Sequence, residues 1–370
     1  MSLTDIFCQD KAISILRRAH ATGKSPHAYI FAGPQGVGRF KTAREWAKML
    51  LCKNPLTENA FTDSCGSCES CRMFEAGSHA DFHLVYKELR EFTTEGKGKP
   101  PPVDLPIDVI REFLIDKISA RPTLSERKVF VISEAEKLNR FSQNCLLKVL
   151  EEPPDYCTLI LLCTRLEKLL PTIKSRCQII RFGSVAEEKI VQKLKGMGVK
   201  QKQAQFWARL AQGSLGQACN WAQLELADAN IYQTKKDLIN SLASYEYPNA
   251  ERLAEYLLRE SKNLAAAWAD LDKTTSKTDI NRRAQKTLVQ IIISALHDAM
   301  MLNLPGTKRI VNFDQAEQIK ASSEHFELEH LAEKIADCYK SLRWIESSVN
   351  ERLIFEQMLL NLANSDIMKV

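Results

Sequence analysis

A glycine-rich segment near the amino terminus has the spacing of a phosphate-binding loop. Gly33 and Gly38 match the outer glycines of the pattern G-x-x-x-x-G-K-[ST], and Gly36 lies between them. Such a loop holds phosphate with backbone N–H groups at the start of a helix. Arg39 stands where the pattern has lysine, and Phe40 stands where it has the hydroxyl that coordinates Mg²⁺. The sequence therefore predicts the form of a nucleotide-binding loop without its metal ligand.

A second position that normally supports the metal is altered as well. We expect an apolar strand over 128–132, and hydrolytic P-loop proteins end this strand with acidic residues that support Mg²⁺ and polarise water. Here Ser133 and Glu134 follow the strand, so a candidate general base remains while serine replaces the aspartate. We therefore expect ATP to be absent, or bound without hydrolysis. A simple glycine-rich turn is the structural alternative.

Four cysteines have the spacing of a metal site. Cys65, Cys68 and Cys71 form two overlapping Cys-x-x-Cys pairs, and Cys52 at the end of a predicted helix offers a fourth thiol. Four thiolates around Zn²⁺ make a closed structural site, which can hold together a module with few apolar residues. An iron–sulfur cluster and reduced free thiols are the alternatives. We predict a zinc module at about residues 52–75.

The composition limits the class of protein. A chain of 370 residues exceeds one ordinary hydrophobic core, so we expect two or three domains. A hydrophobic content of 45% with 26% charged residues is typical of a soluble globular protein. No apolar run approaches the roughly 18–20 residues that span a bilayer, and the amino terminus does not resemble a signal peptide. We therefore expect a cytoplasmic protein without membrane contact.

Alternating strands and helices are expected to position the candidate residues. Apolar runs predict strands over 28–32, 82–86, 128–132, 158–163 and 177–182. Helical spacing of apolar residues predicts helices over 9–22, 39–51, 107–119 and 141–152. This alternation predicts an α/β fold with a parallel sheet and helices on both faces.

The strand patterns stop after Phe182, and helical patterns replace them. We expect an α/β domain over 1–182, a small helical lid over 183–226 and a helical bundle over 227–370. The clearest helices of the bundle are expected over 283–302 and 336–364. The segment 95–106 is rich in Gly, Lys and Pro, and we expect a surface loop there without an assigned role.

Several motifs occur in the order found in one known family. They are His27–Phe31 leading into the glycine loop, the cysteine module, Ser133–Leu138, Asn144–Pro154, Ser175-Arg176-Cys177 and the helix Asn350–Leu360. The chain resembles the AAA+ clamp-loader subunits of bacterial replicative DNA polymerase, the gamma/tau and delta-prime group. The resemblance is dense over 6–182, thinner over the lid, weak through 227–335, and returns at the end. It implies an AAA+ domain with an inserted zinc module, a lid and an oligomerising collar.

Departures from the motifs indicate the type of subunit. Active gamma-type motors keep Lys-Thr in the loop, Asp-Glu after the strand and a sensor arginine in the lid, where this chain has Gly216. The resemblance therefore favours the delta-prime type, a stationary subunit of a pentameric loader without ATPase activity of its own. It implies gamma/tau-type ATPase subunits and a delta-type subunit as partners, within a DNA-directed DNA polymerase complex. The sliding clamp and primer–template DNA would be reached through that complex.

Arg176 has the clearest implied role. It matches the family's arginine finger, which acts in the ATP site of the adjacent subunit; an ordinary surface arginine is the alternative. Two other functions stay open. One is a working gamma/tau-type ATPase, supported by Arg39 and Glu134. The other is a zinc-dependent nucleic-acid-binding protein, supported by the four cysteines together with Lys97 and Lys99.

Overall fold

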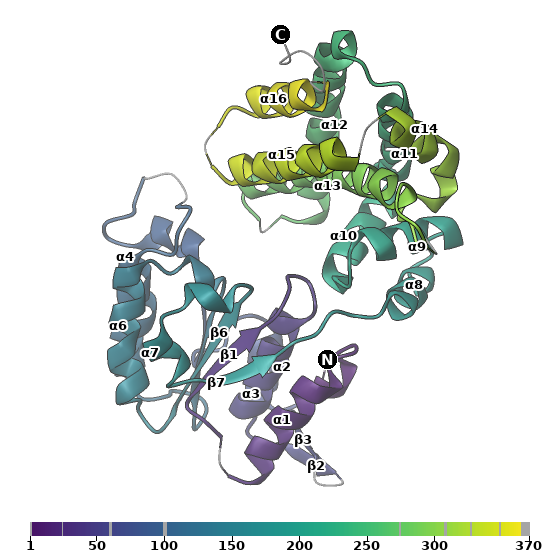
Figure 1. Ribbon diagram of the computed structural model, residues 1–370. Helices are drawn as coiled ribbons and strands as arrows, with labels where there is room; N and C mark the ends of the chain where they lie inside the picture. The colour runs from purple at the N-terminus through teal and green to yellow at the C-terminus, as the bar shows by residue number, and fades with distance from the viewer. Residues whose placement is uncertain are drawn as a thin grey trace. The chain divides into compact units, whose positions relative to one another are not determined.

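The computed structural model describes residues 2–23, 25–58, 61–98, 102–273, 275–306, 309–325, 328–347 and 349–363 (Figure 1). The chain forms two compact units, Met1–Val185 and Ala186–Val370. The three-part division of 1–182, 183–226 and 227–370 stays a prediction, and residues 364–370 of its last part lie outside the described residues.

A parallel sheet is the centre of the first unit. Its strands β1 (Ala28–Ala32), β4 (Phe82–Val85), β5 (Lys128–Ile132), β6 (Cys157–Cys163) and β7 (Gln178–Arg181) lie in the order β4-β5-β6-β1-β7. Every neighbouring pair is parallel. The predicted strands and the predicted α/β fold class are therefore confirmed, and β1, which leads into the glycine loop, lies between two partners.

Helices cover both faces of this sheet (Figure 1). Successive side chains of a strand point to opposite faces, so Tyr29 and Phe31 pack on one side while Ile30 packs on the other. The first side holds α1 (Asp10–Ala21), α2 (Arg39–Leu51) and α3 (Glu69–Glu75); the second holds α4 (Ile107–Ile110), α6 (Arg140–Glu151) and α7 (Pro171–Lys174). Two apolar cores thus clamp the sheet from both sides.

The first unit also departs from the expected elements. The helix expected over 107–119 is divided, because residues Arg111–Ile115 form a π-helical turn before α5 (Asp116–Ile118). In the cysteine module, an antiparallel hairpin of β2 (Leu56–Glu58) and β3 (Phe61–Asp63) precedes α3. Neither the hairpin nor α3 was predicted, because such short elements leave no periodic pattern.

The second unit is helical throughout its described residues. Its helices are α8 (Glu187–Gly196), α9 (Gln201–Leu210), α10 (Leu215–Leu226), α11 (Ile231–Ala243), α12 (Ala250–Leu271), α13 (Lys277–Leu302), α14 (Ala316–His325), α15 (Leu328–Glu346) and α16 (Glu351–Ala363). Within the described parts of the chain, we find no helix with the length and apolar character needed to cross a membrane.

The prediction of a single helix over 336–364 is wrong. Helix α15 ends at Glu346 and α16 begins at Glu351. Asn350 ends the gap: its side-chain oxygen accepts the backbone N–H of Arg352 at 2.9 Å, as a residue preceding a helix does. The apolar spacing continued across this break and concealed it in the sequence.

Candidate functional site

The glycine loop joins β1 to α2, and each glycine has a local reason. A Cβ added to Gly33 would lie 2.5 Å from the carbonyl oxygen of Phe182, so only glycine fits there without displacement. Gly36 and Gly38 have φ angles of 75° and 104°, which favour glycine. Gly38 directly precedes α2. The loop therefore has the strand–loop–helix context that the sequence predicted.

The two altered positions of the loop are both occupied by side chains unsuited to binding Mg²⁺. Arg39 turns back onto the loop, and its Nε donates to the carbonyl oxygen of Pro34 at 3.2 Å. Burial lowers the pKa of the Arg39 guanidinium, while the carboxylate of Glu136 acts in the opposite direction. The Phe40 side chain is 46% exposed and offers no oxygen ligand.

The residues after β5 and β6 lie at the same end of the sheet as the loop, because these strands are parallel to β1 and their carboxyl ends lie together. Glu134 adopts a left-handed backbone conformation, and its carboxylate pairs with Lys137 at 2.7 Å. Glu136 accepts the backbone N–H of Thr164 at 3.2 Å and also its hydroxyl. Sequence reasoning had not singled out Glu136, although it is a second acidic residue near the loop.

Ser133 and Gly216 are the two remaining positions at which the sequence departs from the family's nucleotide contacts. The backbone N–H of Ser133 donates to the carbonyl oxygen of Val85 at 2.9 Å, which joins β5 to β4. In the second unit, Gly216 lies in the first turn of α10, after Ser214 has capped this helix through the N–H of Gln217. Gly216 offers no side chain with which to contact a phosphate.

Arg176 lies at the opposite end of the sheet from the loop of its own chain. It precedes β7, whose register sets Arg181 beside Ala32 at the loop end of β1. Phe182 follows Arg176 by six positions, so at about 3.3 Å per residue the separation along the strands is about 20 Å. The Arg176 guanidinium is 2.8 Å from the carboxylate of Glu151, and its side chain is 35% exposed.

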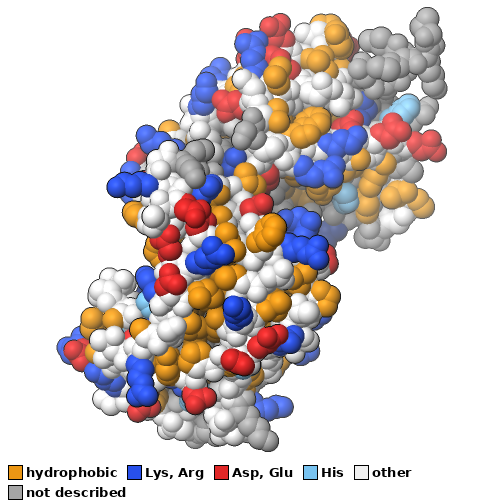
Figure 2. Space-filling model, turned by 90° about the vertical axis from the view of Figure 1, so that its left-hand side faces the viewer, with side chains coloured by type: hydrophobic (Ala, Val, Ile, Leu, Met, Phe, Trp, Pro, Cys, Tyr) orange, Lys and Arg blue, Asp and Glu red, His pale blue; other side chains and the backbone are white. Residues whose placement is uncertain are grey.

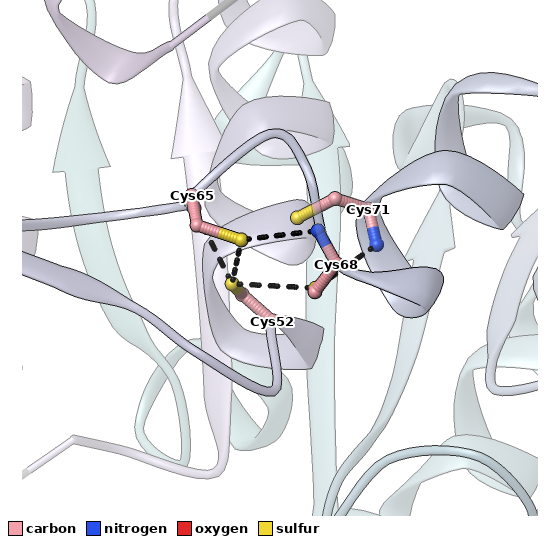
Figure 3. Close-up of side chains that lie close together, drawn as sticks. All are labelled: Cys52, Cys65, Cys68 and Cys71. Carbon is pink, nitrogen blue, oxygen red and sulfur yellow. Dashed lines mark hydrogen bonds between the residues drawn. The ribbon is translucent and has the colours of Figure 1, made fainter.

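The four predicted cysteines come together (Figure 3). Cys52 follows the last residue of α2, Cys65 lies in the loop after β3, Cys68 caps α3, and Cys71 is buried in α3. Their sulfur atoms all lie within 4.8 Å of one another.

The spacing of the sulfurs fits a tetrahedral metal site. Cys52 Sγ is 3.6 Å from Cys65 Sγ and 3.9 Å from Cys68 Sγ. Zn–S bonds of about 2.3 Å in a tetrahedron set the sulfurs about 3.8 Å apart. Burial opposes ionisation of Cys65, but hydrogen bonds with Ser67, Cys68 and Cys52 lower its pKa to about 6. Burial raises the pKa of the Cys52 and Cys71 thiols, so it is the spacing of the four sulfurs that makes this donor set fit a thiophilic ion.

A buried hydrogen-bond network fixes this cysteine module to the sheet. The carbonyl oxygen of Leu51, beside Cys52, accepts the hydroxyls of Ser70 at 2.6 Å and Ser125 at 2.7 Å. Ser70 also contacts His79 Nε2 at 2.9 Å, and His79 Nδ1 accepts the N–H of Asp81 at 3.1 Å. Sequence reasoning missed these partners, because they meet only in the folded chain.

The basic residues of the third hypothesis are only partly described. Lys97 is exposed, whereas Lys99, Pro100 and Pro101 of the predicted 95–106 loop lie outside the described residues. On the face in Figure 2, Lys and Arg side chains are scattered among acidic and hydrophobic ones and form no continuous basic surface.

Comparison with known proteins identifies the family. The family described as DNA polymerase III, delta subunit, matches residues 8–186, and its C-terminal counterpart matches residues 262–364. The tau/gamma subunit of Haemophilus influenzae is 30% identical over 287 residues, which are 74% of this chain and 39% of that protein. The delta' subunit of Pseudomonas aeruginosa is 37% identical over 151 residues, 41% of each chain.

A third relative matches along almost the whole chain. The delta' subunit of Buchnera aphidicola is 26% identical over 348 residues, covering 93% of this chain and 92% of that protein. This chain thus spans about two fifths of the first two relatives and nearly all of the third. A gamma subunit-related structure from Thermotoga maritima covers 95% of this chain and 98% of its own, with 17% identity and a TM-score of 0.42, too low to add weight. The chain belongs to the family of DNA polymerase III clamp-loader subunits.

Proposed function

We propose that this chain is a delta-prime-type clamp-loader subunit, which hydrolyses no ATP itself and provides Arg176 as an arginine finger to a neighbouring ATP site. It would stabilise a pentameric loader that sets the sliding clamp on primed DNA in the cytoplasm. Its direct partners would be gamma/tau-type ATPase subunits and a delta-type subunit. Contact with the clamp and with primer–template DNA would come through the complex.

The loop geometry supports the absence of ATP hydrolysis. Arg39 is turned onto the carbonyl oxygen of Pro34, and Phe40 presents an apolar ring where Mg²⁺ needs an oxygen ligand. Glu134 keeps a carboxylate after β5, but Ser133 replaces the aspartate that would support the ion. A base without a positioned metal cannot neutralise the charge that develops during phosphoryl transfer.

The position of Arg176 is the observation that carries the proposal. An arginine finger stabilises the charge on the transferring phosphoryl group and must reach within hydrogen-bond distance of it. Arg176 is about 20 Å along the sheet from its own loop, beyond the reach of one side chain. Any phosphate that it contacts in an ATP site therefore belongs to another chain.

The direct test is Arg176→Ala in a loader reconstituted with the gamma/tau-type and delta-type subunits of the same organism. We expect normal assembly by size-exclusion chromatography and a loss of about 10³-fold or more in turnover at the site that Arg176 serves. Lys174→Ala, which removes a neighbouring positive charge, is the matched control and should keep full activity. Wild-type ATPase and clamp loading by Arg176→Ala would exclude the proposed role.

A gamma/tau-type ATPase is the second candidate, favoured by the relative named tau/gamma that aligns over 287 residues. This function requires that the isolated chain binds ATP with Mg²⁺ and turns it over. We expect no hydrolysis above background. Turnover that disappears in Glu134→Gln would establish the second candidate instead.

We further propose that the four cysteines hold a structural Zn²⁺. The sulfur spacing fits a tetrahedral site, and four thiolate ligands leave no open position for a substrate. Zinc would join the end of α2 to α3 and so stabilise the module that contains the β2–β3 hairpin. An iron–sulfur cluster at the same residues would give a coloured protein with stoichiometric iron.

A further inference from the structure

The side chain of Arg176 is held by its own chain on two sides. One terminal nitrogen lies 2.8 Å from the carboxylate of Glu151. The other donates to the carbonyl oxygen of Thr172 at 3.1 Å and to the hydroxyl of Ser175 at 3.4 Å. The contacts to Thr172 and Ser175 are local, whereas Glu151 comes from a different helix. Both terminal nitrogens, which an arginine uses to bind phosphate, therefore already have partners.

Glu151 occupies an unfavourable position unless a cation accompanies it. It is the last residue of α6, where the helix dipole disfavours a carboxylate. Pro153 and Pro154 follow in the turn to β6, and they prevent the helix from continuing. Strands β6 and β7 are both parallel to β1, so all three begin at the same end of the sheet. The end of α6, which leads to β6, and the residues before β7 therefore lie at this end. Arg176 is the cation that the structure pairs with Glu151 there.

We propose that Glu151 competes with the neighbouring subunit's ATP for Arg176, and that it restrains the arginine until the subunits close on each other. This inference rests on the proposed function of Arg176. A carboxylate and a phosphate bind the same N–H donors of a guanidinium, so the two contacts exclude each other. The carboxylate also neutralises the positive charge that the finger supplies. Glu151 is thus a positioning residue that acts through Arg176.

The exposure of the pair makes this restraint weak. The side chains of Arg176 and Glu151 are 35% and 49% exposed, and ion pairs of this kind hold their partners only modestly. Removing the carboxylate should therefore raise the fraction of free Arg176 by about 1.5- to 5-fold. A contact of this strength can yield to a triphosphate without blocking the site.

The first arm of the test measures ATPase activity in the reconstituted loader without clamp or DNA. Glu151→Gln should raise the rate by about 1.5- to 5-fold, because a larger fraction of Arg176 is then free to contact the neighbouring subunit's ATP. Without clamp and DNA, only the affinity of the subunits for one another brings them together. Glu152→Gln removes the same charge one residue further along and should leave the rate unchanged. In an Arg176→Ala background, Glu151→Gln should have no effect.

The second arm uses the full-length chain alone and does not depend on the loader. Phenylglyoxal modifies accessible guanidinium groups, and mass spectrometry of the peptide that contains Arg176 gives its rate of modification. Glu151→Gln should speed this modification by a similar factor, whereas Glu152→Gln should not. Circular dichroism of each variant checks that the helices are intact.

The outcomes separate this inference from the function on which it rests. Unchanged modification of Arg176 in Glu151→Gln overturns the restraint. Faster modification with an unchanged or lower ATPase rate, while Arg176→Ala is inactive, overturns the competition and leaves the arginine finger standing. Full ATPase activity in Arg176→Ala refutes the finger, and the competition with it.

Discussion

Gly33→Ala tests whether the first glycine of the loop serves the fold instead of a ligand. The added Cβ would lie 2.5 Å from the carbonyl oxygen of Phe182 and 2.9 Å from its Cβ. Neither atom can rotate away, because the N–H of Phe182 is bonded to the carbonyl oxygen of Ala32 at 2.8 Å. Relief of the clash requires β1 and β7 to move apart at their carboxyl ends.

The size of the effect follows from this rigidity. Overpacking of a well-packed region costs about 1–3 kcal/mol. For a unit of this length each kcal/mol lowers Tm by about 2–4 °C, so the expected decrease is about 2–12 °C. Gly183→Ala is the matched control, since a Cβ there meets nothing within 4 Å. It should change the free energy of unfolding by less than about 0.5 kcal/mol.

The measurement is thermal unfolding without nucleotide, combined with hydrogen exchange of the peptides that contain β1 and β7. Gly33→Ala should speed exchange in both peptides, while Gly183→Ala should match the wild type. If the two variants behave alike, packing against Phe182 does not require this glycine. Our explanation of why this position of the loop requires glycine would then fail.

Two further predictions concern the metal and the pH dependence. Purified protein should contain one Zn²⁺ per chain, and Cys71→Ser, which replaces a fully buried thiol, should lose it and speed hydrogen exchange over residues 52–75; retained zinc would contradict the four-cysteine site. Burial, assisted by Lys117 and Lys128, lowers the pKa of His83 to about 4 from an ordinary value of 6.5. The stability due to its neutral form is therefore complete above pH 6.5 and lost as the pH falls through 4. After allowance for partial exposure we expect a loss of about 1–2 kcal/mol, measured by urea unfolding at pH 7 and pH 4 and reduced in His83→Phe.

The sheet could be predicted from the sequence because its strands are buried on both faces. Such strands read as continuous apolar runs, and β1 and β5 begin and end at the predicted residues. All residues of both strands are buried, as their apolar composition predicts. The order of the strands has no comparable local signal, since it depends on contacts between segments far apart in the chain.

The missed elements depend on polar residues instead of apolar spacing. Val349 and Leu353 extend the spacing of α15 across the break, yet they are 46% and 60% exposed. They are therefore not buried as the continuous pattern implied. Asn350 before Glu351 was the available signal, because asparagine followed by an acidic first turn is typical of a helix start.

The sequence motifs pointed to candidate residues, but not to the side chains that contact them in the fold. Glu136 is 28 residues from Thr164 in sequence, and the pair forms because β5 and β6 are neighbours. Arg176 and Glu151 meet for a similar reason, at the end of the sheet where the strands begin. A motif identifies a charged residue, whereas the order of the strands decides which residue of opposite charge lies beside it.

The loop shows why a glycine pattern alone is weak evidence for nucleotide binding. Gly33 is required by its approach to Phe182, and Gly38 by its left-handed backbone, and neither reason involves a phosphate. Packing does not fix Arg39 and Phe40 in this way, since the Arg39 side chain lies on the surface of the loop and that of Phe40 is 46% exposed. The fold therefore tolerates substitutions at these two positions more readily than at the glycines, which packing and backbone conformation fix. The side chains that bind metal, and not the glycines, decide whether such a loop can hydrolyse ATP.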